Sequence, residues 1–196
     1  MALSEGASSR RHGSKMAQRL AGGRAAVAVC GTGRDLDAEL EILSEELGAE
    51  ICRAGMNLVT GGLGGVMEAA SRGAFQARER GEGRCSILGI LPGEKAEDAN
   101  PYCDMVIPTG IGIARNLLVV RAADAVVLLH GGSGTLSEAA FAWQIGKPMV
   151  ALTASGGWAG RLGGQRLDAR RQDAILSART AAEAVALLVD ELSGLK

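Results

Sequence analysis

Short apolar runs alternate with longer amphipathic segments along the chain from Ala25 onward. The runs are apolar almost throughout. They are AAVAVCG, MNLVTGG, SILGILPG, DMVIPTG, DAVVLLHGG, KPMVAL and DAILSA, and the first five of them end in glycine. Uninterrupted apolar runs of this kind indicate strands that are buried on both faces, and such strands are typical of parallel sheets. We therefore predict a buried, mostly parallel sheet.

The segments between these runs have helical character. We expect helices over about 36–53, 66–80, 112–123 and 135–146. A closing helix is expected to begin at a capping box formed by Thr180 and Glu183. Strands that alternate with helices build a doubly wound α/β domain, with helices on both faces of the sheet. Residues 25–196 are expected to form this single ligand-binding domain.

The N-terminal segment has a different composition. Residues 1–24 are rich in Ser, Gly and Arg and lack apolar periodicity, so we interpret them as a disordered tail, with Met16 as an alternative start. Arg10 and Arg11 resemble a twin-arginine signal, but no apolar region follows them. No segment approaches the roughly 18 apolar residues of a membrane helix, and we expect a cytoplasmic protein with no membrane partner.

Composition narrows the classes of partner. The chain has 21 basic and 22 acidic residues, so net charge does not draw it to nucleic acid, and an anion site must be local. Only two histidines are present, which argues against a histidine metal cage, and we expect no metal. The four cysteines form no CxxC pair and are expected to be reduced, mostly buried thiols.

Four glycine-rich turns follow expected strands and precede expected helices. Their residues are Gly31 and Gly33; Gly61, Gly62, Gly64 and Gly65; Gly110 and Gly112; and Gly131, Gly132, Ser133, Gly134 and Thr135. In an open α/β sheet, ligands bind outside the carboxyl ends of the strands, where backbone N–H groups and helix N-termini converge. These turns are therefore expected to hold a phosphate-bearing ligand.

The usual nucleotide motifs do not fit these turns. In GTGRDL, Leu36 stands where a dinucleotide fingerprint has its third glycine, and the second strand ends in Thr60 rather than in an acid that could bind a ribose diol. Lys147 follows a glycine but precedes Pro148, so the P-loop consensus is absent. A dinucleotide oxidoreductase is disfavoured and a P-loop NTPase is excluded.

Four segments in order identify a family: TGGLGGVMEAASRGA, ILGILPGEKAEDANPY, IPTGIGIARNLLVVRAADAVVLLHGGSGTLSEAA and GKPMVAL. From about Ala25 to the C-terminus, the chain resembles the LONELY GUY-related Rossmann-fold proteins, and most of all their molybdenum cofactor carrier protein-like family. The GGxGTxxE pattern is typical of the superfamily, whereas TGIGIARN and GGVMEAA favour the carrier-like branch. The resemblance implies a Rossmann-like fold.

The same resemblance implies two alternative functions. In LONELY GUY enzymes, the residues that match Arg115 and Glu138 serve as catalytic groups that hydrolyse the N-glycosidic bond of a nucleoside 5′-monophosphate. Those enzymes have Lys where this chain has Asn116 and Pro where it has His130, and losing the lysine removes a cation from the pocket. Carrier-like proteins instead bind the phosphorylated pterin of molybdopterin or molybdenum cofactor without turnover, and need no further cofactor. A lysine decarboxylase is set aside, because Lys147 has no evident acidic partner for a pyridoxal ring.

Several residues at the turns have a functional and a structural interpretation. Glu138 can face the sugar of a ligand, or it can form a capping box with Thr135. Arg115 can bind a phosphate bidentately, or it can be a solvated surface residue. Asn116 can bind the edge of a base or pterin, or cap a helix. His130 can act as an acid or base, or it can be a satisfied imidazole at the end of a strand.

The helix expected at 135–146 is apolar on two sides. One side contains Leu136, Ala139, Ala140 and Trp143, and another contains Phe141, Ala142 and Ile145. Such a helix needs two packing partners, the sheet and a second subunit, so a homo-oligomer (dimer or tetramer) is expected. A face of small residues that also permits close helix packing is formed by Ala69, Ala70, Gly73, Ala74 and Ala77.

Overall fold

The computed structural model describes residues 23–34 and 36–194, so the tail expected at 1–24 lies almost entirely outside the described residues. The strands are β1 (Ala26–Gly31), β2 (Asn57–Thr60), β3 (Ile87–Leu91), β4 (Met105–Pro108), β5 (Ala125–Leu129), β6 (Met149–Leu152) and β7 (Leu176–Ala178). The α-helices are α1 (Ala38–Arg53), α2 (Val66–Glu79), α3 (Asn116–Ala122), α4 (Ser133–Gln144), α5 (Gly157–Leu162) and α6 (Ala181–Gly194). Short 3₁₀ helices are η1 (Ala96–Asp98), η2 (Gly112–Arg115) and η3 (Thr153–Ser155).

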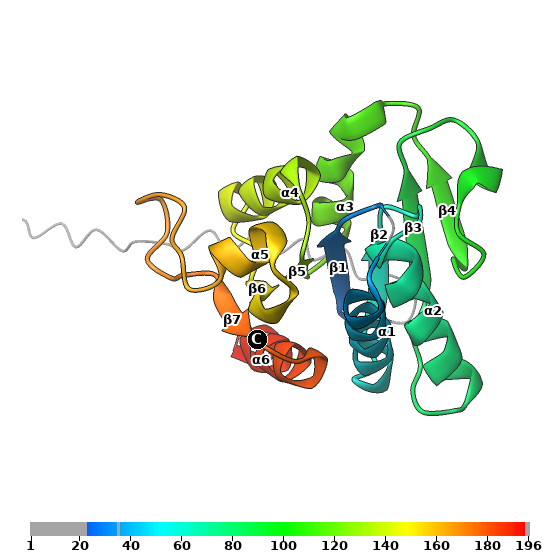
Figure 1. Ribbon diagram of the computed structural model, residues 1–196, viewed down its shortest axis with the longest axis horizontal. Helices are drawn as coiled ribbons and strands as arrows, with labels where there is room; N and C mark the ends of the chain where they lie inside the picture. The colour runs from blue at the N-terminus through cyan, green and yellow to red at the C-terminus, as the bar shows by residue number, and fades with distance from the viewer. Residues whose placement is uncertain (1–22, 35, 195–196) are drawn as a thin grey trace, which may run out of the picture.

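The strands form one seven-stranded sheet in the order β4-β3-β2-β1-β5-β6-β7, and neighbouring strands are parallel. The central strand β1 pairs with β2 on one side and with β5 on the other (Figure 1). At the start of β1, the Ala26 N–H donates to the carboxylate of Asp124, 98 residues away, at 2.9 Å. This topology confirms the predicted doubly wound α/β fold, and the sheet is parallel throughout.

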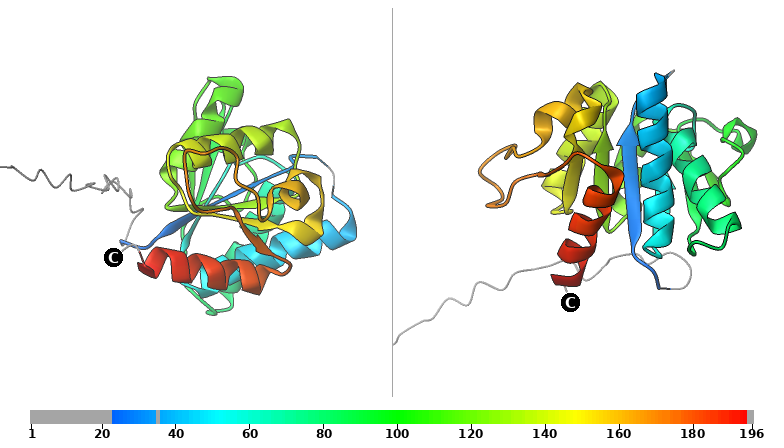
Figure 2. Two further views of the ribbon diagram at one scale, coloured as in Figure 1. Left: turned by 90° about the vertical axis from the view of Figure 1, so that its left-hand side faces the viewer. Right: turned by 60° about the horizontal axis from the view of Figure 1, so that its bottom comes forward.

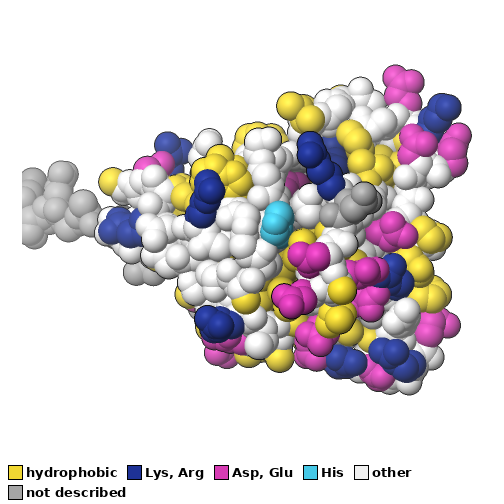
Figure 3. Space-filling model, in the orientation of Figure 1, with side chains coloured by type: hydrophobic (Ala, Val, Ile, Leu, Met, Phe, Trp, Pro, Cys, Tyr) yellow, Lys and Arg dark blue, Asp and Glu magenta, His cyan; other side chains and the backbone are white. Residues whose placement is uncertain are grey.

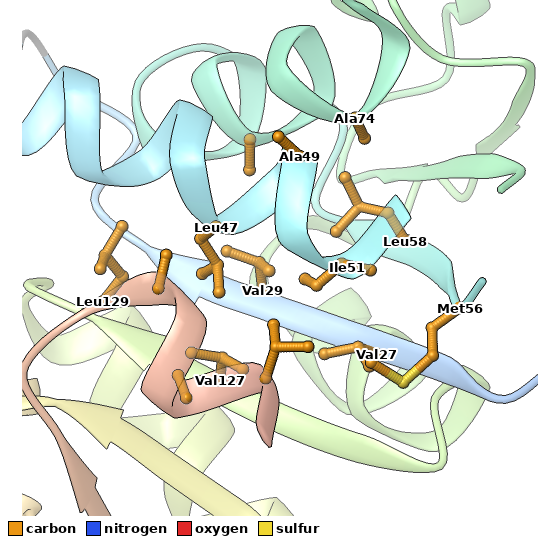
Figure 4. Close-up of a cluster of buried hydrophobic side chains, with 14 of the residues drawn as sticks. Val27, Val29, Leu47, Ala49, Ile51, Met56, Leu58, Ala74, Val127 and Leu129 are labelled. Atoms are coloured by element: carbon orange, nitrogen blue, oxygen red, sulfur yellow. The ribbon is translucent and has the colours of Figure 1, made fainter. Parts of the chain in front are cut away.

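Helices cover both faces of the sheet (Figure 2). Helices α1, α2 and α6 pack on one face, and α3, α4 and α5 on the other. Side chains alternate along each strand, so Val27 and Val29 enter the first core and contact the α1 layer around Leu47 and Ile51 (Figure 4). The intervening β1 residue Ala28 belongs to the second core. Burial on both faces explains why the inner strands are apolar throughout. The edge strand β4 is an exception to the expected burial, because Met105 and Ile107 are 40% and 47% exposed.

Helices α1 and α2 contact each other through their backbones. A methyl group added at Gly48 of α1 would overlap the carbonyl oxygen of Ala70, and one added at Gly73 of α2 would overlap the carbonyl oxygen of Glu45. The small face predicted on α2 therefore packs against α1 of the same chain. This contact fixes the two helices whose N-termini follow β1 and β2.

Helix α4 packs not only on the sheet but also against another segment of the same chain. The Trp143 indole N–H donates to Asp168 at 2.9 Å, and the Arg171 guanidinium lies 4.7 Å from the centroid of the indole ring. Both residues belong to the segment between α5 and β7. The sequence analysis expected the sheet and a second subunit as the two partners of this helix, and the polar loop showed no pattern that would predict its contact with Trp143.

The ends of the helices only partly match the expected capping. The Thr180 hydroxyl accepts from the Glu183 N–H at 3.2 Å, as predicted, but the Glu183 carboxylate accepts from the N–H of Arg179 rather than of Thr180. In the described part of the chain, no helix has both the length and the apolar character needed to cross a membrane.

Candidate functional site

The four glycine turns lie along one edge of the sheet. They follow β1, β2, β4 and β5, and the carboxyl ends of these parallel strands point the same way (Figure 1). The chain reverses its direction of winding between β1 and β5, which is where open α/β sheets bind ligands. The turns after β1, β2 and β5 lie at or beside this switch point. The turn with Gly110 and Gly112 instead follows β4, the edge strand of the sheet.

Some of the predicted glycines are required by packing. A side chain at Gly31 would lie 2.6 Å from Val66, and Gly65, with φ of 65°, would meet the Thr32 carbonyl oxygen at 2.5 Å. Gly62, with φ of 75°, faces Leu91 at 2.7 Å. These three positions are glycine because neighbouring segments leave no room, which is a structural role.

Other predicted glycines leave open space. A side chain at Gly112 or Gly132 would meet nothing within 4 Å among the described residues, and one at Gly64 would only approach the Glu68 carboxylate at 3.7 Å. The positions differ in backbone: Gly112 has a φ of 59°, whereas Gly132 has an ordinary negative φ of −111°. Gly132 and Gly64 thus leave their backbone accessible to a ligand.

Arg115 and Glu138 form a buried ion pair. The Arg115 Nη1 lies 3.6 Å from the Glu138 Oε1, and their side chains are 9% and 7% exposed. The guanidinium lies against Gly61, where any side chain would overlap it. The alternative of a solvated surface arginine is therefore wrong. A buried arginine beside a glycine turn has its donors fixed in direction before a ligand arrives.

Asn116 links this pair to the turn after β5. Its amide oxygen accepts from Arg115 at 2.9 Å, and its amide nitrogen donates to the Ser137 hydroxyl at 3.0 Å. Ser137 in turn donates to the Gly134 carbonyl at 2.6 Å. Asn116 does not cap its helix, because its backbone is helical and α3 has no side-chain cap. Its amide positions Arg115 against the first turn of α4.

The capping box predicted for Thr135 and Glu138 is wrong. Helix α4 begins at Ser133, two residues before Thr135, because the Leu136 N–H closes the first turn on the Gly132 carbonyl at 3.0 Å. Thr135 lies inside the helix beneath Gly131, and its hydroxyl is buried without a hydrogen-bond partner. Among the described residues no side chain caps α4, so its first N–H groups have no side-chain acceptor there.

His130 directly follows β5 and has a left-handed conformation, with φ of 52°. Its N–H donates to the Ser155 hydroxyl at 2.6 Å, and its carbonyl oxygen accepts from the Ala159 N–H at 3.0 Å. The imidazole Nδ1 is buried and has no hydrogen-bond partner among the described residues, so the imidazole is not satisfied as the structural interpretation required. A strained backbone conformation that neighbouring hydrogen bonds hold in place is typical of functional sites.

Three buried polar atoms at this edge lack partners in the described part of the chain: the Arg115 Nε, the His130 Nδ1 and the Thr135 Oγ1. Buried polar groups in proteins are nearly always hydrogen-bonded, so a cluster of exceptions points to a missing partner. His130 precedes the glycine turn before α4, Thr135 lies in the first turn of α4, and Arg115 pairs with Glu138 of the same helix. The arrangement suits a ligand with several acceptor oxygens.

The electrostatics of the site centre on Glu138. Burial raises the pKa of the Glu138 carboxyl to about 7, while the Arg115 charge and a hydrogen bond with the Cys30 thiol act in the opposite direction. Burial also raises the pKa of Cys30 well above its usual value, so the thiol keeps its proton. Burial lowers the pKa of Arg115, an effect that Glu138 opposes.

This shift makes the stability of the protein depend on pH. Between the ordinary pKa of 4.5 and about 7, the folded chain holds a proton on Glu138 that the unfolded chain has released. The free energy of unfolding should therefore fall by about 3 kcal/mol as pH rises through this window. We expect Glu138→Gln to remove this part of the decrease in urea unfolding at pH 5 and pH 8. Glu79→Gln, an exposed change at the end of α2, should retain it; an unchanged decrease in Glu138→Gln would contradict the assignment.

Sequence reasoning did not identify Cys30, Ser137 or Glu68 as neighbours of the site. Cys30 was interpreted only as a buried thiol, and nothing in its spacing indicates contact with Glu138. Glu68 belongs to a cavity of about 300 Å³ between the starts of α1 and α2. The cavity is lined by Gly33, Arg34, Leu36, Glu41, Gly64, Gly65, Glu68, Ala69 and Arg72. The turn after β2 supplies Gly64 to the cavity wall and Gly61 to the contact with Arg115, and the Arg115–Glu138 pair does not line the cavity.

A comparison of the sequence with known families gives a match over residues 24–185 to the SLOG cluster4 family. The chain belongs to the SLOG cluster4 family. This SLOG protein is also similar to solved structures. TM1055 is 34% identical with a TM-score of 0.76, over 85% of this chain and 99% of TM1055.

Two further structures similar to this SLOG protein are of proteins whose names state what they bind or carry. The molybdenum cofactor binding protein of Rippkaea orientalis is 27% identical with a TM-score of 0.69, over 86% of this chain and 98% of that one. The molybdenum cofactor carrier protein of Chlamydomonas reinhardtii is 31% identical with a TM-score of 0.70, over 87% and 99%. The predicted resemblance to the LONELY GUY-related superfamily and its carrier-like branch is confirmed.

Proposed function

We propose that this SLOG cluster4 protein binds a phosphorylated small molecule at the carboxyl edge of its sheet and holds it without turnover. The observation that carries the proposal is the cluster of unpartnered buried atoms on Arg115, His130 and Thr135 beside the uncapped N-terminus of α4. Molybdopterin, molybdenum cofactor and nucleoside monophosphates are the candidate ligands. The carrier and binding proteins of similar structure support the first two.

Each part of the site has a role in this proposal. The phosphate lies against the first N–H groups of α4, at Ser133 to Thr135, where the helix dipole favours an anion. Arg115 adds a charge-assisted hydrogen bond, and Asn116 holds it in place. Glu138 accepts hydrogen bonds from hydroxyl groups of the ligand. The low net charge of the chain is no obstacle, because these donors act at short range.

The alternative is hydrolysis of a nucleoside 5′-monophosphate. The observation that favours it is a buried carboxyl, Glu138, with a pKa of about 7 beside a cation. Such a group could stabilise positive charge at the anomeric carbon as the N-glycosidic bond breaks. Against it, Asn116 replaces the lysine of the hydrolases, and Arg115 already neutralises the carboxylate.

One experiment tests both functions. We expect calorimetric titration with molybdopterin and a panel of nucleoside monophosphates to give saturable binding of at least one compound, with no free base or ribose 5-phosphate released. Release of base that disappears in Glu138→Gln would establish the hydrolase instead. If no compound binds, the proposed function is wrong.

The proposal includes a homo-oligomer, either a dimer or a tetramer. Next to the turn that carries Arg115, Ile111, Ile113 and Leu118 are 50%, 88% and 39% exposed. Large apolar side chains exposed together are typical of interfaces. This surface is the one that a second subunit would cover.

A further inference from the structure

The cavity between the starts of α1 and α2 has the size of a small-molecule site. Its volume of about 300 Å³ is at the lower end of the range for ligand pockets, roughly 300–1,000 Å³. Its wall contains the backbone of Gly33 and Gly64, and acidic and basic side chains gather over this part of the molecule (Figure 3). In the proposed function the phosphate binds at α4, outside this cavity. The polar residues that line the cavity are therefore suited to another part of the ligand.

Two charged residues of the cavity are already paired. Arg72 donates to both Glu41 and Glu45 of α1, and so its charge is neutralised across the helix contact. Glu68 stands four residues before Arg72 on α2, a spacing at which the two would be expected to pair. They do not, because Arg72 turns to α1. Within residues 23–34 and 36–194, Glu68 forms no ion pair.

Glu68 is therefore a carboxylate that lines the cavity and has no ion-pair partner in the described part of the chain. It lies in the first turn of α2, and its Oε2 would be 3.7 Å from a side chain at Gly64. An ionised carboxylate only accepts hydrogen bonds, through two parallel oxygens. The complementary partner is a flat group with two adjacent N–H donors. Arg34, in the same wall, supplies donors for a neighbouring carbonyl oxygen.

The cavity also lies within reach of the phosphate site. Arg115 packs against Gly61, and the cavity wall begins at Gly64, three residues further along the same turn. Gly31, at the end of β1, pairs with Leu129 at the end of β5, so the turn that contains Gly33 of the cavity wall begins beside the turn that leads to α4. One molecule the size of a nucleotide can therefore occupy both places, with its phosphate at α4 and its ring system between α1 and α2.

We propose that Glu68 binds the 2-amino-4-oxopyrimidine edge of the ligand, the edge that pterins and guanine share, and that this contact excludes adenine. That edge has a ring N–H and an amino group side by side, and a carbonyl oxygen next to them. Adenine presents a ring acceptor beside its amino group, and this acceptor would face a carboxylate lone pair. The inference rests on the proposed function and adds the class of ring that the site selects.

The test compares ligands that differ at this edge. We expect titration calorimetry to show GMP binding at least tenfold more tightly than AMP, with IMP, which lacks the amino group, between them. Glu68→Gln should remove this preference. The affinity of this variant for ribose 5-phosphate should stay within twofold of that of the unchanged protein. Glu79→Gln, an equal charge change at the exposed end of α2, should preserve the preference. Phosphorylated hydroxymethylpterin, run beside GMP, distinguishes a pterin from a guanine ligand by its affinity.

The outcomes separate this inference from the proposed function. If ribose 5-phosphate binds but GMP and AMP bind equally, or Glu68→Gln keeps the preference for GMP, the role of Glu68 is wrong and the phosphate site stands. If ribose 5-phosphate does not bind, unphosphorylated pterin and adenosine are compared by saturation-transfer NMR. Pterin binding that Glu68→Gln abolishes would then support Glu68 and reject the phosphate site, and no binding of either compound would overturn both.

Discussion

Replacing Arg115 with Ala is expected to weaken the binding of a nucleoside monophosphate or molybdopterin by about 100-fold. The change removes a charge-assisted contact to the phosphate from a site where the cation is already buried and oriented, a loss of about 3 kcal/mol. Arg115→Lys should recover only part of the affinity, because an ammonium cannot form two parallel hydrogen bonds. Titration calorimetry measures both changes.

The control for this experiment is Arg121→Gln on the same helix. Arg121 is exposed and lies at the end of α3, so the loss of its charge should change the affinity by less than twofold. Thermal unfolding and near-ultraviolet circular dichroism would establish that the Arg115 variants remain folded. An affinity of Arg115→Ala within threefold of the unchanged protein would mean that the phosphate is held elsewhere.

Gly73→Ala is expected to destabilise the fold by about 2–4 kcal/mol, although alanine is the better helix former. The added methyl would overlap the Glu45 carbonyl oxygen of α1, so the two helices would have to separate along their contact. Overpacking of this kind costs more than the roughly 1 kcal/mol that alanine gains in helix propensity. The shift in the urea midpoint at an unchanged slope measures the effect.

Gly194→Ala is the matched control, because this glycine is also helical but has open space around it. It should leave stability unchanged or slightly raise it. If Gly73→Ala behaved in the same way, the close backbone contact between α1 and α2 would not exist in solution.

The sequence was sufficient to predict the layers of the fold and the edge that carries the site. Strands that are apolar on both faces, each followed by a glycine turn, allow few arrangements other than a parallel sheet with its turns on one edge. For this reason, the pairing of Arg115 with the region of Glu138 could be expected before any geometry was known.

The finer features of the site could not be predicted, because they depend on single contacts. The Thr135–Glu138 spacing satisfies the pattern of a capping box. The helix nevertheless begins earlier, because the backbone conformation lets the Gly132 carbonyl accept the first helical hydrogen bond. Among the described residues Glu68 has no ion-pair partner, since Arg72 donates to Glu41 and Glu45 of α1 instead. When a side chain can pair with either of two partners at similar energy, the periodicity of the sequence does not predict which partner it contacts.

The pairing of β1 with β5 bears on how the molecule is made. A ribosome releases β1 first, but the neighbour that completes its hydrogen bonding, and the Asp124 carboxylate that binds Ala26, arrive 98 residues later. Until then, one side of the central strand stays without its neighbour, and the nascent half-sheet offers an open edge to other chains. We therefore expect chains that end before β5 to aggregate more readily than the full chain.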